Sequence, residues 1–372
     1  MSNKIQQIAL YKAYLDYMDA KIELQNYKKA LDQKLAQYFT KKLQEMHEVG
    51  PSARDAVKSI RDMLLAGGKR VRASFMYWGY RAANGKDFEK IIEASMSIEL
   101  THIFLLIHDD IIDRDDFRHG VQAIHKKYEN LAKRFYKKVD PKHFGDSMAI
   151  VVGDMAAAFG NDIIFNSRFA PERKQKALSK LQEIVVNTVS GEILDVMLEA
   201  KGQASEKEIL EVHRNKTAKY TVEGPLHLGA LLAGADEKML KVLSEYAVPV
   251  GIAFQIQDDI LGAFGDEKKL GKPVCSDLRE GKQTLLIAKA LENGNAEQKR
   301  LIKKLLGNKN VSESGIESFR QTIRETGSLD YSQALAKKYV ERGKKAIEKS
   351  DFEKVTREFL VGIADYIVKR EV

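Results

Sequence analysis

The chain has 372 residues, of which 44% are hydrophobic and 31% are charged, a composition typical of a globular protein with a sizeable core. Its formal net charge is +8, but acids and bases are mixed along most of the chain, so we expect no nucleic-acid partner. A single cysteine, Cys275, excludes an internal disulfide and favours a reducing, cytoplasmic setting. Uninterrupted apolar runs fall short of the roughly 18 residues that a membrane-spanning helix needs, so we expect no transmembrane segment.

Apolar residues recur every three to four positions over residues 4–48, which predicts a long amphipathic helix or a pair of helices. The same period predicts further helices at 52–65, 70–83, 88–113, 146–168, 172–199, 206–215, 217–234, 236–264, 281–292, 296–306, 313–325, 328–348 and 351–369. No stretch alternates with a period of two, so we expect an all-α, single-domain bundle of ten or more helices around a deep central cavity. Residues 1–50 would form an N-terminal helical segment that packs on the core, and residues 51–372 the main domain.

One cluster departs from the even mixing of charges. The stretch "KRFYKKVDPKHF", residues 133–144, is strongly basic and contains aromatic side chains. We interpret it mainly as a solvated loop around Pro141. The alternative is a contact with a membrane or a partner protein.

The stretch "LLIHDDIIDRDDFRHG", residues 105–120, places five carboxylates within eight positions directly after an apolar run. On a helix, Asp109 and Asp113 lie on one face, where like charges repel each other. A divalent cation between them would remove this repulsion, and ligands that are all oxygen favour Mg²⁺. Taken alone, the stretch is equally consistent with a solvated helix end whose acids form salt bridges.

A second acidic pair favours the metal site. The stretch "IAFQIQDDILGAFGDEKKLGKP" places Asp258 and Asp259 near the end of another apolar helix. If the two helices are neighbours in a bundle, the two pairs face each other across the mouth of a cavity. Metal ions between them would hold a diphosphate.

Basic residues suited to such an anion also occur in clusters. The stretch "GGKRVR" places Lys69, Arg70 and Arg72 at a predicted helix N-terminus, behind two glycines that allow close backbone approach. Helix N-termini attract anions, and the arginine fork matches phosphate oxygens. Further cations follow the acidic helices at Arg118, in "NKT" (215–217), and at Lys272 and Lys282.

In this order along residues 60–370, "GGKRVR", "DDIID", "VVGD", "NKT", "PLHLGALLAG", "FQIQDDILGAFGDEKKLGKPVCSDLREGKQTLL" and "YIVKREV" resemble the motifs of the trans-type isoprenyl diphosphate synthases, or polyprenyl synthetases. The resemblance implies the isoprenoid synthase fold and usually a homodimer. It also implies a prenyltransferase that condenses isopentenyl diphosphate with C5–C15 allylic diphosphates.

The resemblance also implies roles for individual residues. Asp109, Asp113 and Asp258 would bind three Mg²⁺ ions, for which Mn²⁺ could substitute. Arg118, Lys216 and Lys272 would complete the catalytic set by gripping the allylic diphosphate. The other substrate-binding residues implied are Thr217, Gln255 and Lys282 around the allylic diphosphate, and Lys69, Arg72, His102 and His119 around isopentenyl diphosphate.

Two positions depart from the family pattern. The sequence "FRHG" has His119 where the family usually has a second arginine, and we hypothesise that a protonated His119 still helps to bind isopentenyl diphosphate. The second motif usually ends in an aspartate four residues after Asp258, where this chain has Gly262. We expect less redundancy in metal binding here, and not inactivity.

Product length in the family depends on the residue that blocks the pocket floor. Phe104, five residues before Asp109, resembles that floor residue, although it would equally suit an ordinary core position. Leu105 stands where one type of farnesyl diphosphate synthase has a second aromatic, which leaves more room. The resemblance therefore favours geranylgeranyl diphosphate (C20), with farnesyl diphosphate (C15) as the alternative.

Two further readings share the fold. A class I terpene cyclase would replace the second acidic motif, and "NDIIFNSRF", residues 161–169, begins suitably but has Phe165 at the serine position. A non-catalytic subunit of a heteromeric synthase would typically lose aspartates from the metal motifs, and this chain keeps them. Both readings are therefore less favoured than a catalytic synthase.

Overall fold

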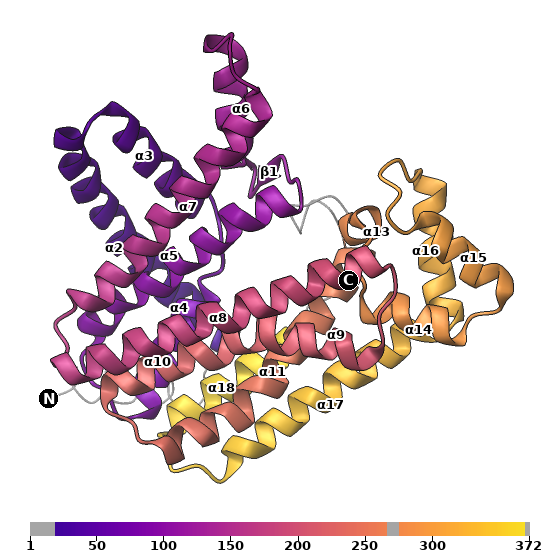
Figure 1. The fold of residues 1–372 in the computed structure, drawn as a ribbon. Helices are drawn as coiled ribbons and strands as arrows, with labels where there is room; N and C mark the ends of the chain where they lie inside the picture. The colour runs from indigo at the N-terminus through magenta and orange to yellow at the C-terminus, as the bar shows by residue number, and fades with distance from the viewer. Residues whose placement is uncertain (1–18, 266–274, 369–372) are drawn as a thin grey trace, which may run out of the picture.

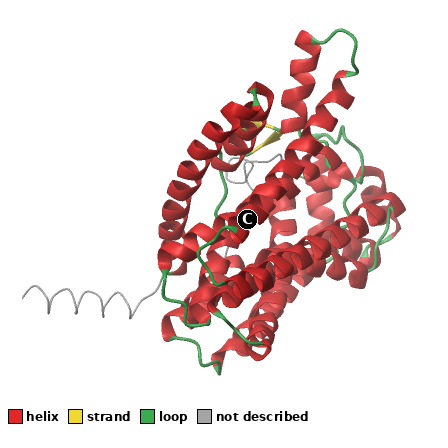
Figure 2. Ribbon diagram, turned by 60° about the vertical axis from the view of Figure 1, so that its left-hand side comes forward, coloured by secondary structure: helices red, strands yellow, loops and turns green. Residues whose placement is uncertain are grey.

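The computed structural model describes residues 19–265 and 275–368, which form a bundle of helices with one small β-hairpin (Figures 1 and 2). The α-helices are α2 (Ala20–Val49), α3 (Pro51–Leu65), α4 (Val71–Ala82), α5 (Phe88–Ile112), α6 (Ile124–Phe135), α7 (Pro141–Phe165), α8 (Pro171–Lys201), α9 (Glu206–Val212), α10 (Gly224–Ala233), α11 (Glu237–Phe264), α13 (Ser276–Glu280), α14 (Leu285–Asn293), α15 (Ala296–Leu305), α16 (Glu313–Glu325), α17 (Ser328–Glu348) and α18 (Lys354–Val368). The π-helix η1 (His213–Glu223) joins α9 to α10, and β1 (Phe117–Arg118) pairs antiparallel with β2 (Val121–Gln122).

Short polar side chains begin the long helices that carry the site. Asp19 caps α2, Asp87 caps α5 and Asp236 caps α11, each accepting a hydrogen bond from a backbone N–H of the first turn. Because these N–H groups have no partner inside the helix, a carboxylate cap stabilises the helix start by about 1 kcal/mol. Proline at the first helical position begins α7 and α8 in the same way, since its missing N–H costs nothing there.

Two buried clusters fill the bundle. One surrounds α5 and includes Phe39 of α2, and the other surrounds α11 and includes Phe359 of α18. Trp78 of α4 stacks on Phe359 with ring centroids 4.3 Å apart. The N-terminal helix α2 contributes to both clusters, through Leu24 to one and Phe39 to the other.

Helices α4 and α10 approach each other unusually closely. A Cβ atom at Gly79 would lie 2.0 Å from the carbonyl oxygen of Leu226, and one at Gly229 would lie 1.8 Å from that of Met76. Any larger side chain at either position would therefore push the two helices apart. This contact fixes α4, and with it the loop that precedes α4, against the rest of the bundle.

Several parts of the fold differ from the predicted elements. Helices α6 and α13 are not predicted, and the helix predicted at 281–292 begins at Leu285 as α14. The part of the predicted segment 4–48 before residue 19 lies outside the described residues. The stretch 206–233 is one continuous helical segment with η1 in its middle, where two separate helices are predicted. Helix α7 begins at Pro141, five residues earlier than predicted, and pairs with α6. The hairpin of β1 and β2 is also unpredicted, because two-residue strands are too short to show an alternating pattern.

Helices α5, α7 and α11 are long and apolar enough to cross a membrane by length and composition alone. The protein buries 67% of the most apolar window of α5 and 56% of that of α11, which accounts for their composition. For α7 the buried share is 39%. Counting uninterrupted apolar residues does not identify these helices, because isolated polar residues interrupt each run.

Candidate active site

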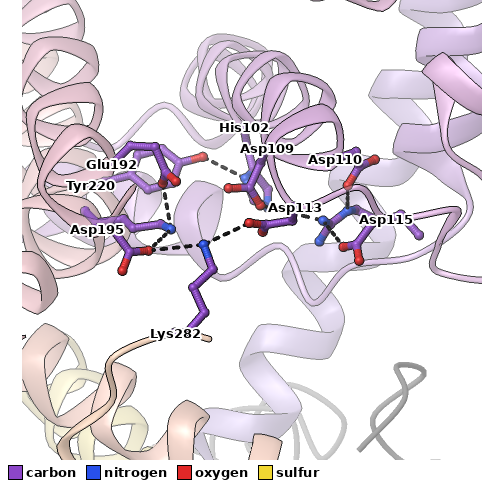
Figure 3. Close-up of polar contacts among 11 residues, drawn as sticks. His102, Asp109, Asp110, Asp113, Asp115, Glu192, Asp195, Tyr220 and Lys282 are labelled. Carbon is purple, nitrogen blue, oxygen red and sulfur yellow. Dashed lines mark hydrogen bonds and ion pairs between the residues drawn. The ribbon is translucent and has the colours of Figure 1, made fainter. Parts of the chain in front are cut away.

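The acidic stretch after the apolar part of α5 opens into a cavity of about 350 Å³. Asp109, in the last turn of α5, and Asp113, at its C-cap, both line this cavity. The C-terminal end of a helix carries partial negative charge, so two carboxylates there need cations nearby. Figure 3 shows the two carboxylates beside Lys282, whose Nζ lies 2.9 Å from Oδ1 of Asp113.

Arg118 reaches this acidic end from the β-hairpin. Its buried guanidinium forms ion pairs with Asp110, with Asp115 at 2.9 Å and with Asp109 at 3.6 Å. The hairpin turn places His119 at φ 51° and Gly120 at φ 77°, left-handed conformations that fold the chain back tightly. Burial raises the pKa of the Asp110 carboxyl to about 7, although Arg118 acts against this shift. Asp110 therefore holds Arg118 in place from behind the cavity.

The opposite wall belongs to α11 and η1. Thr217 donates from Oγ1 to Oε1 of Gln255 at 2.6 Å, and Gln255 donates from Nε2 to Oδ1 of Asp259 at 2.7 Å. All three residues line the same cavity as Asp109 and Asp113. Asp259 of the second motif therefore lines the same cavity as Asp109 and Asp113, and metal binding by Asp258 stays a prediction. Asp258, one residue earlier, is exposed and lines a neighbouring cavity.

Two lysines and the acids of α8 complete the first cavity. Lys216 lies 2.6 Å from Oε2 of Glu192 and 2.7 Å from Oδ2 of Asp195. Burial works against the charge of Lys216, but Asp195, Asp109 and Glu192 raise its pKa well above the ordinary value. Lys282 also lies 3.6 Å from Asp195. Both ammonium groups are therefore held charged at the wall of the cavity.

The acids of α8 are functional-site residues that the sequence reasoning missed. In "GEILDVMLE", Glu192, Asp195 and Glu199 recur every three to four residues and so share one face of α8. Gly191 lets η1 pack directly on this face, because a Cβ there would lie 2.4 Å from the backbone nitrogen of Lys216. The spacing of these acids indicates that they share one face of α8. Only the structure shows that η1 packs on that face.

A second cavity, of about 410 Å³, lies next to the first and shares the lining residues Ser276 and Asp277 with it. Lys69, Arg72, His102 and His119 line it, as the predicted site for the second diphosphate requires. The side chain of His119 lies against the Gly67 position, where a Cβ would be 3.0 Å from its ring. Gly67 thus makes room for His119.

Arg70 lines the second cavity together with Lys69 and Arg72, but its guanidinium is paired inside the protein. It adopts φ 56° before α4, and its buried guanidinium turns inward to pair with Asp32 at 2.8 Å and Glu99 at 3.2 Å. It also donates to the carbonyl oxygen of Leu64. With three partners inside the protein, Arg70 anchors the loop, and Lys69 and Arg72 on either side line the cavity.

Two contacts hold the ring of His102 in this cavity. Nη1 of Arg72 lies 3.1 Å from Nε2 of His102, and Oη of Tyr220 lies 2.7 Å from Nδ1 of the same ring. The guanidinium of Arg72 also lies 4.4 Å from the centre of the Tyr220 ring. Burial, together with Arg72, Arg118 and Arg70, holds the pKa of His102 well below its usual range, so its imidazole is neutral. Tyr220 is a further site residue that the sequence reasoning did not identify.

The missing aspartate at Gly262 has a structural counterpart. A Cβ at Gly262 would lie 3.2 Å from Oδ2 of Asp277, and Asp277 lines both cavities from the start of α13. A carboxylate from another element therefore stands beside the position that the family motif usually fills. Lys272 lies outside the described residues.

Phe104 is half-buried one turn before His108, and its ring lies 4.9 Å from that of His108 in an edge-to-face arrangement. His108 in turn lies over Gly153 of α7, where a Cβ would meet its ring at 2.4 Å. Phe104 is not among the residues that line the two cavities. It lies one to two turns below Asp109, on the side of α5 that meets α7.

The first cavity suits a hard divalent cation by its chemistry. Its donors are carboxylate oxygens, and the acids are crowded: burial, with Asp113, Asp277 and Asp115 close by, raises the pKa of Glu280 to about 7. No group of three possible ligands among the described residues is already arranged around a metal position. Lys282 occupies the place beside Asp113 that a cation would share. The residues therefore fit Mg²⁺ in type, and Asp109 and Asp113 both line the cavity.

Comparison with known proteins identifies the family. The family model of the polyprenyl synthetases matches residues 54–323. The chain belongs to this family. It is 34% identical over 314 residues to a geranylgeranyl pyrophosphate synthase of Geoglobus acetivorans, covering 84% of this polyprenyl synthetase and 90% of the relative. It is 35% identical over 313 residues to a geranylfarnesyl diphosphate synthase of Aeropyrum pernix, covering 83% and 92%.

A solved structure agrees with this assignment. The geranylgeranyl pyrophosphate synthase of Corynebacterium glutamicum, crystallised with isoprenyl diphosphate and magnesium, superposes with a TM-score of 0.88 at 32% identity. The match covers 94% of this chain and 99% of that structure. The family and the all-α fold predicted from the motifs of this polyprenyl synthetase are both confirmed.

Proposed function

We propose that this polyprenyl synthetase condenses isopentenyl diphosphate with allylic diphosphates and forms geranylgeranyl diphosphate. The observation that carries the proposal is the pair of adjoining cavities with different charge. The first contains Asp109, Asp113 and Asp259 together with two lysines, Lys216 and Lys282, that ion pairs hold in place. It therefore suits a metal-bound diphosphate. The second presents Lys69 and Arg72 without such acid crowding, and so suits a diphosphate bound directly.

In the first step the allylic C–O bond breaks, and the bonding electrons leave with the diphosphate. Bound Mg²⁺ would supply Lewis-acid stabilisation of this leaving group, held by Asp109 and Asp113. Lys216 and Arg118 contribute fixed positive charge at the same place, and such preorganised charge is worth several kcal/mol in a water-poor site. The bond breaks without a protein nucleophile.

In the second step the double bond of isopentenyl diphosphate attacks the allylic carbocation, and one proton is then lost. Lys69 and Arg72 hold the attacking substrate by its diphosphate, so that its double bond lies toward the first cavity. The proton passes to the released diphosphate, the strongest base present that does not belong to the protein. Apolar side chains of α5 such as Ile103 and Leu106 exclude water, which would otherwise capture the cation.

The proposed C20 product rests on Phe104 and on the relatives. Phe104 is the bulky side chain below Asp109 on α5, and Leu105 beside it is smaller. Relatives similar over most of the chain are named geranylgeranyl and geranylfarnesyl diphosphate synthases. Farnesyl diphosphate remains the alternative product.

We further propose a cytoplasmic homodimer that depends on Mg²⁺. Helices α7 and α8 pack together and expose an apolar surface that a second copy would cover. Its residues are Ile150, Val151, Phe165, Val186, Val189, Ile193, Val196 and Met197. The lone Cys275 is buried and free, which suits a reducing compartment.

The test is direct incubation of the purified protein with Mg²⁺, isopentenyl diphosphate and each of dimethylallyl, geranyl and farnesyl diphosphate in turn. We expect elongation of all three primers to a C20 product, identified by mass spectrometry. Cyclic hydrocarbons in place of diphosphates would indicate a terpene cyclase. No elongation of any primer, with the protein folded and dimeric, would refute the proposed function.

A further inference from the structure

Helices α6 and α7 form an antiparallel pair whose connecting turn projects beyond the rest of the bundle in both views (Figures 1 and 2). We call residues 133–144, which end α6, form the turn and begin α7, the α6–α7 tip. Ten of its twelve side chains are exposed, all but Pro141 and Phe144. The tip lies outside both cavities and has no part in the chemistry proposed above.

The tip carries a local excess of positive charge. It contains five lysines or arginines and one acid, Asp140, whose carboxylate is occupied in capping α7. Lys133 pairs with Glu129 at 2.5 Å and Lys142 with Asp146 at 2.7 Å. Three other cations form no ion pair with any described residue; they are Arg134, Lys137 and Lys138.

Apolar side chains are exposed between these cations. Phe135 is 64% exposed, Tyr136 48% and Val139 43%. The ring of Tyr136 packs edge-to-face on Phe144 at 5.4 Å, and the guanidinium of Arg134 lies 5.3 Å from the ring of Phe135. A purely solvated turn gains nothing from exposing two aromatic rings, whereas aromatic rings with flanking cations are the combination that binds the headgroup layer of a membrane.

We propose that the α6–α7 tip docks this protein on a membrane surface rich in anionic lipid headgroups. Arg134, Lys137 and Lys138 supply the attraction to anionic headgroups, and Phe135, Tyr136 and Val139 enter the boundary between headgroups and acyl chains. The shape favours a membrane over a protein partner, because a convex turn cannot offer the roughly 800 Å² per partner of a stable protein interface.

The position of the tip fits the substrate chemistry. The β-hairpin that follows the acidic end of α5 leads directly into α6, so the tip rises from the end of the bundle that holds the first cavity. Phe117 lines that cavity and is 64% exposed, and Ile112 nearby is 45% exposed. A prenyl diphosphate is an amphiphile, and docking at this end would place the cavity mouth near the lipid that accepts such a product.

The test is co-sedimentation of the full chain with vesicles of phosphatidylcholine alone or with one third phosphatidylglycerol. The tip charge variant is Arg134→Glu, Lys137→Glu and Lys138→Glu together. The matched control is Lys303→Glu, Lys304→Glu and Lys309→Glu, three exposed lysines of the α15 region whose change alters the net charge equally. A second tip variant, Phe135→Ser with Tyr136→Ser, removes the rings and keeps the charge.

We expect the wild type and the α15 control to bind the anionic vesicles and not the neutral ones. Each cation near an anionic surface is worth a factor of about five in partitioning, so the tip charge variant should bind at least tenfold more weakly. The ring variant should also bind several-fold more weakly. All variants should keep the wild-type melting temperature and prenyl transfer to soluble primers, because binding to vesicles requires no turnover.

Three results would overturn the proposal. The first is a wild type that sediments with neither vesicle, and the second is a loss of binding in the α15 control equal to that of the tip charge variant. The third is a ring variant that binds the anionic vesicles as tightly as the wild type, which would mean that Phe135 and Tyr136 do not enter the headgroup layer. None of these results bears on prenyl transfer, so failure here is distinguishable from failure of the proposed function.

Discussion

Oη of Tyr220 and Nδ1 of His102 are 2.7 Å apart, and the hydrogen of this hydrogen bond is carried by Nδ1 of His102. Arginine has donors only, so Arg72, 3.1 Å from Nε2, donates to that nitrogen. A neutral imidazole with Nε2 as acceptor carries its proton on Nδ1 and donates it to the tyrosine oxygen. The hydroxyl hydrogen of Tyr220 is then free to donate to a group other than His102.

Tyr220→Phe should therefore weaken the binding of isopentenyl diphosphate. It keeps the ring that Arg72 contacts and removes only the acceptor for His102, which leaves a buried N–H unsatisfied at a cost of about 1–3 kcal/mol. We expect KM for isopentenyl diphosphate to rise about tenfold with little change in KM for the allylic primer. Tyr246→Phe is the matched control, because it loses a buried bond to the carbonyl oxygen of Leu360 at 2.7 Å. Equal KM values in both variants would contradict the role of Tyr220.

Phe104→Ala should lengthen the product. Removing the ring opens space below Asp109 on α5, where the growing chain would extend. Mass spectrometry of products formed from farnesyl diphosphate should show C25 or longer. Phe88→Ala, which removes a 44% exposed ring from the start of the same helix, should leave the product unchanged. An unchanged product from Phe104→Ala would mean that Phe104 is an ordinary core residue.

Asp277→Asn should weaken Mg²⁺ binding if Asp277 replaces the carboxylate missing at Gly262. Gly262→Asp should also be harmful, because it brings a second carboxylate beside Oδ2 of Asp277, where like charges repel. The double variant Gly262→Asp with Asp277→Asn should recover, since one carboxylate is again present. The measurement is the Mg²⁺ concentration needed for thermal stabilisation by inorganic diphosphate, which requires no turnover. If the losses of Mg²⁺ binding in the two single variants add up in the double variant, the carboxylate of Asp277 does not replace the one missing at Gly262.

His119 should make binding of isopentenyl diphosphate depend on pH. It lines the second cavity beside Lys69, and a protonated imidazole there adds positive charge for the diphosphate. KM for isopentenyl diphosphate should fall as pH is lowered from 8 to 6, and His119→Arg should remove this trend. A KM that is flat over this range in the wild type would count against the hypothesis.

His227, buried in α10, should make stability fall in mild acid. Burial lowers its pKa, so as the pH falls below about 6.5 the unfolded chain takes up a proton that the folded protein does not. The stability present above pH 6.5 is then lost by at most about 1.4 kcal/mol per pH unit. Urea unfolding at pH 7.5 and 5.5 should show a smaller difference for His227→Gln than for the wild type. If the wild type and His227→Gln lose the same free energy of unfolding between these pH values, the lowered pKa of His227 is contradicted.

The helices of the bundle follow closely from the sequence, because each long helix buries one face and so repeats its apolar residues every three to four positions. The π-helix η1 does not follow in this way, since its wider turn depends on packing against Gly191 and α11. Helix α6 and the start of α7 are also unpredicted, and Pro141 is as typical of a turn as of the first residue of a helix.

For the site, motif residues were predictable where their spacing is itself informative. Asp109 and Asp113 line the first cavity, and Lys69 and Arg72 line the second. The inward pairing of Arg70 does not follow from the sequence, because a local stretch of basic residues does not show which one meets Asp32 and Glu99 inside the protein. For the same reason the sequence pointed to neither Tyr220 nor Asp277, whose partners are distant in the chain.

The ion pair between Arg70 and Asp32 reaches from the loop before α4 to the helix that begins at Ala20. Shortening the chain from its beginning past Asp32 would release this tether and leave the guanidinium with Glu99 and the carbonyl oxygen of Leu64 only. Such a truncated enzyme should keep its aspartates and lysines in the first cavity, yet hold isopentenyl diphosphate loosely. Helix α2 thus stabilises, from a distance, the loop that binds the second substrate.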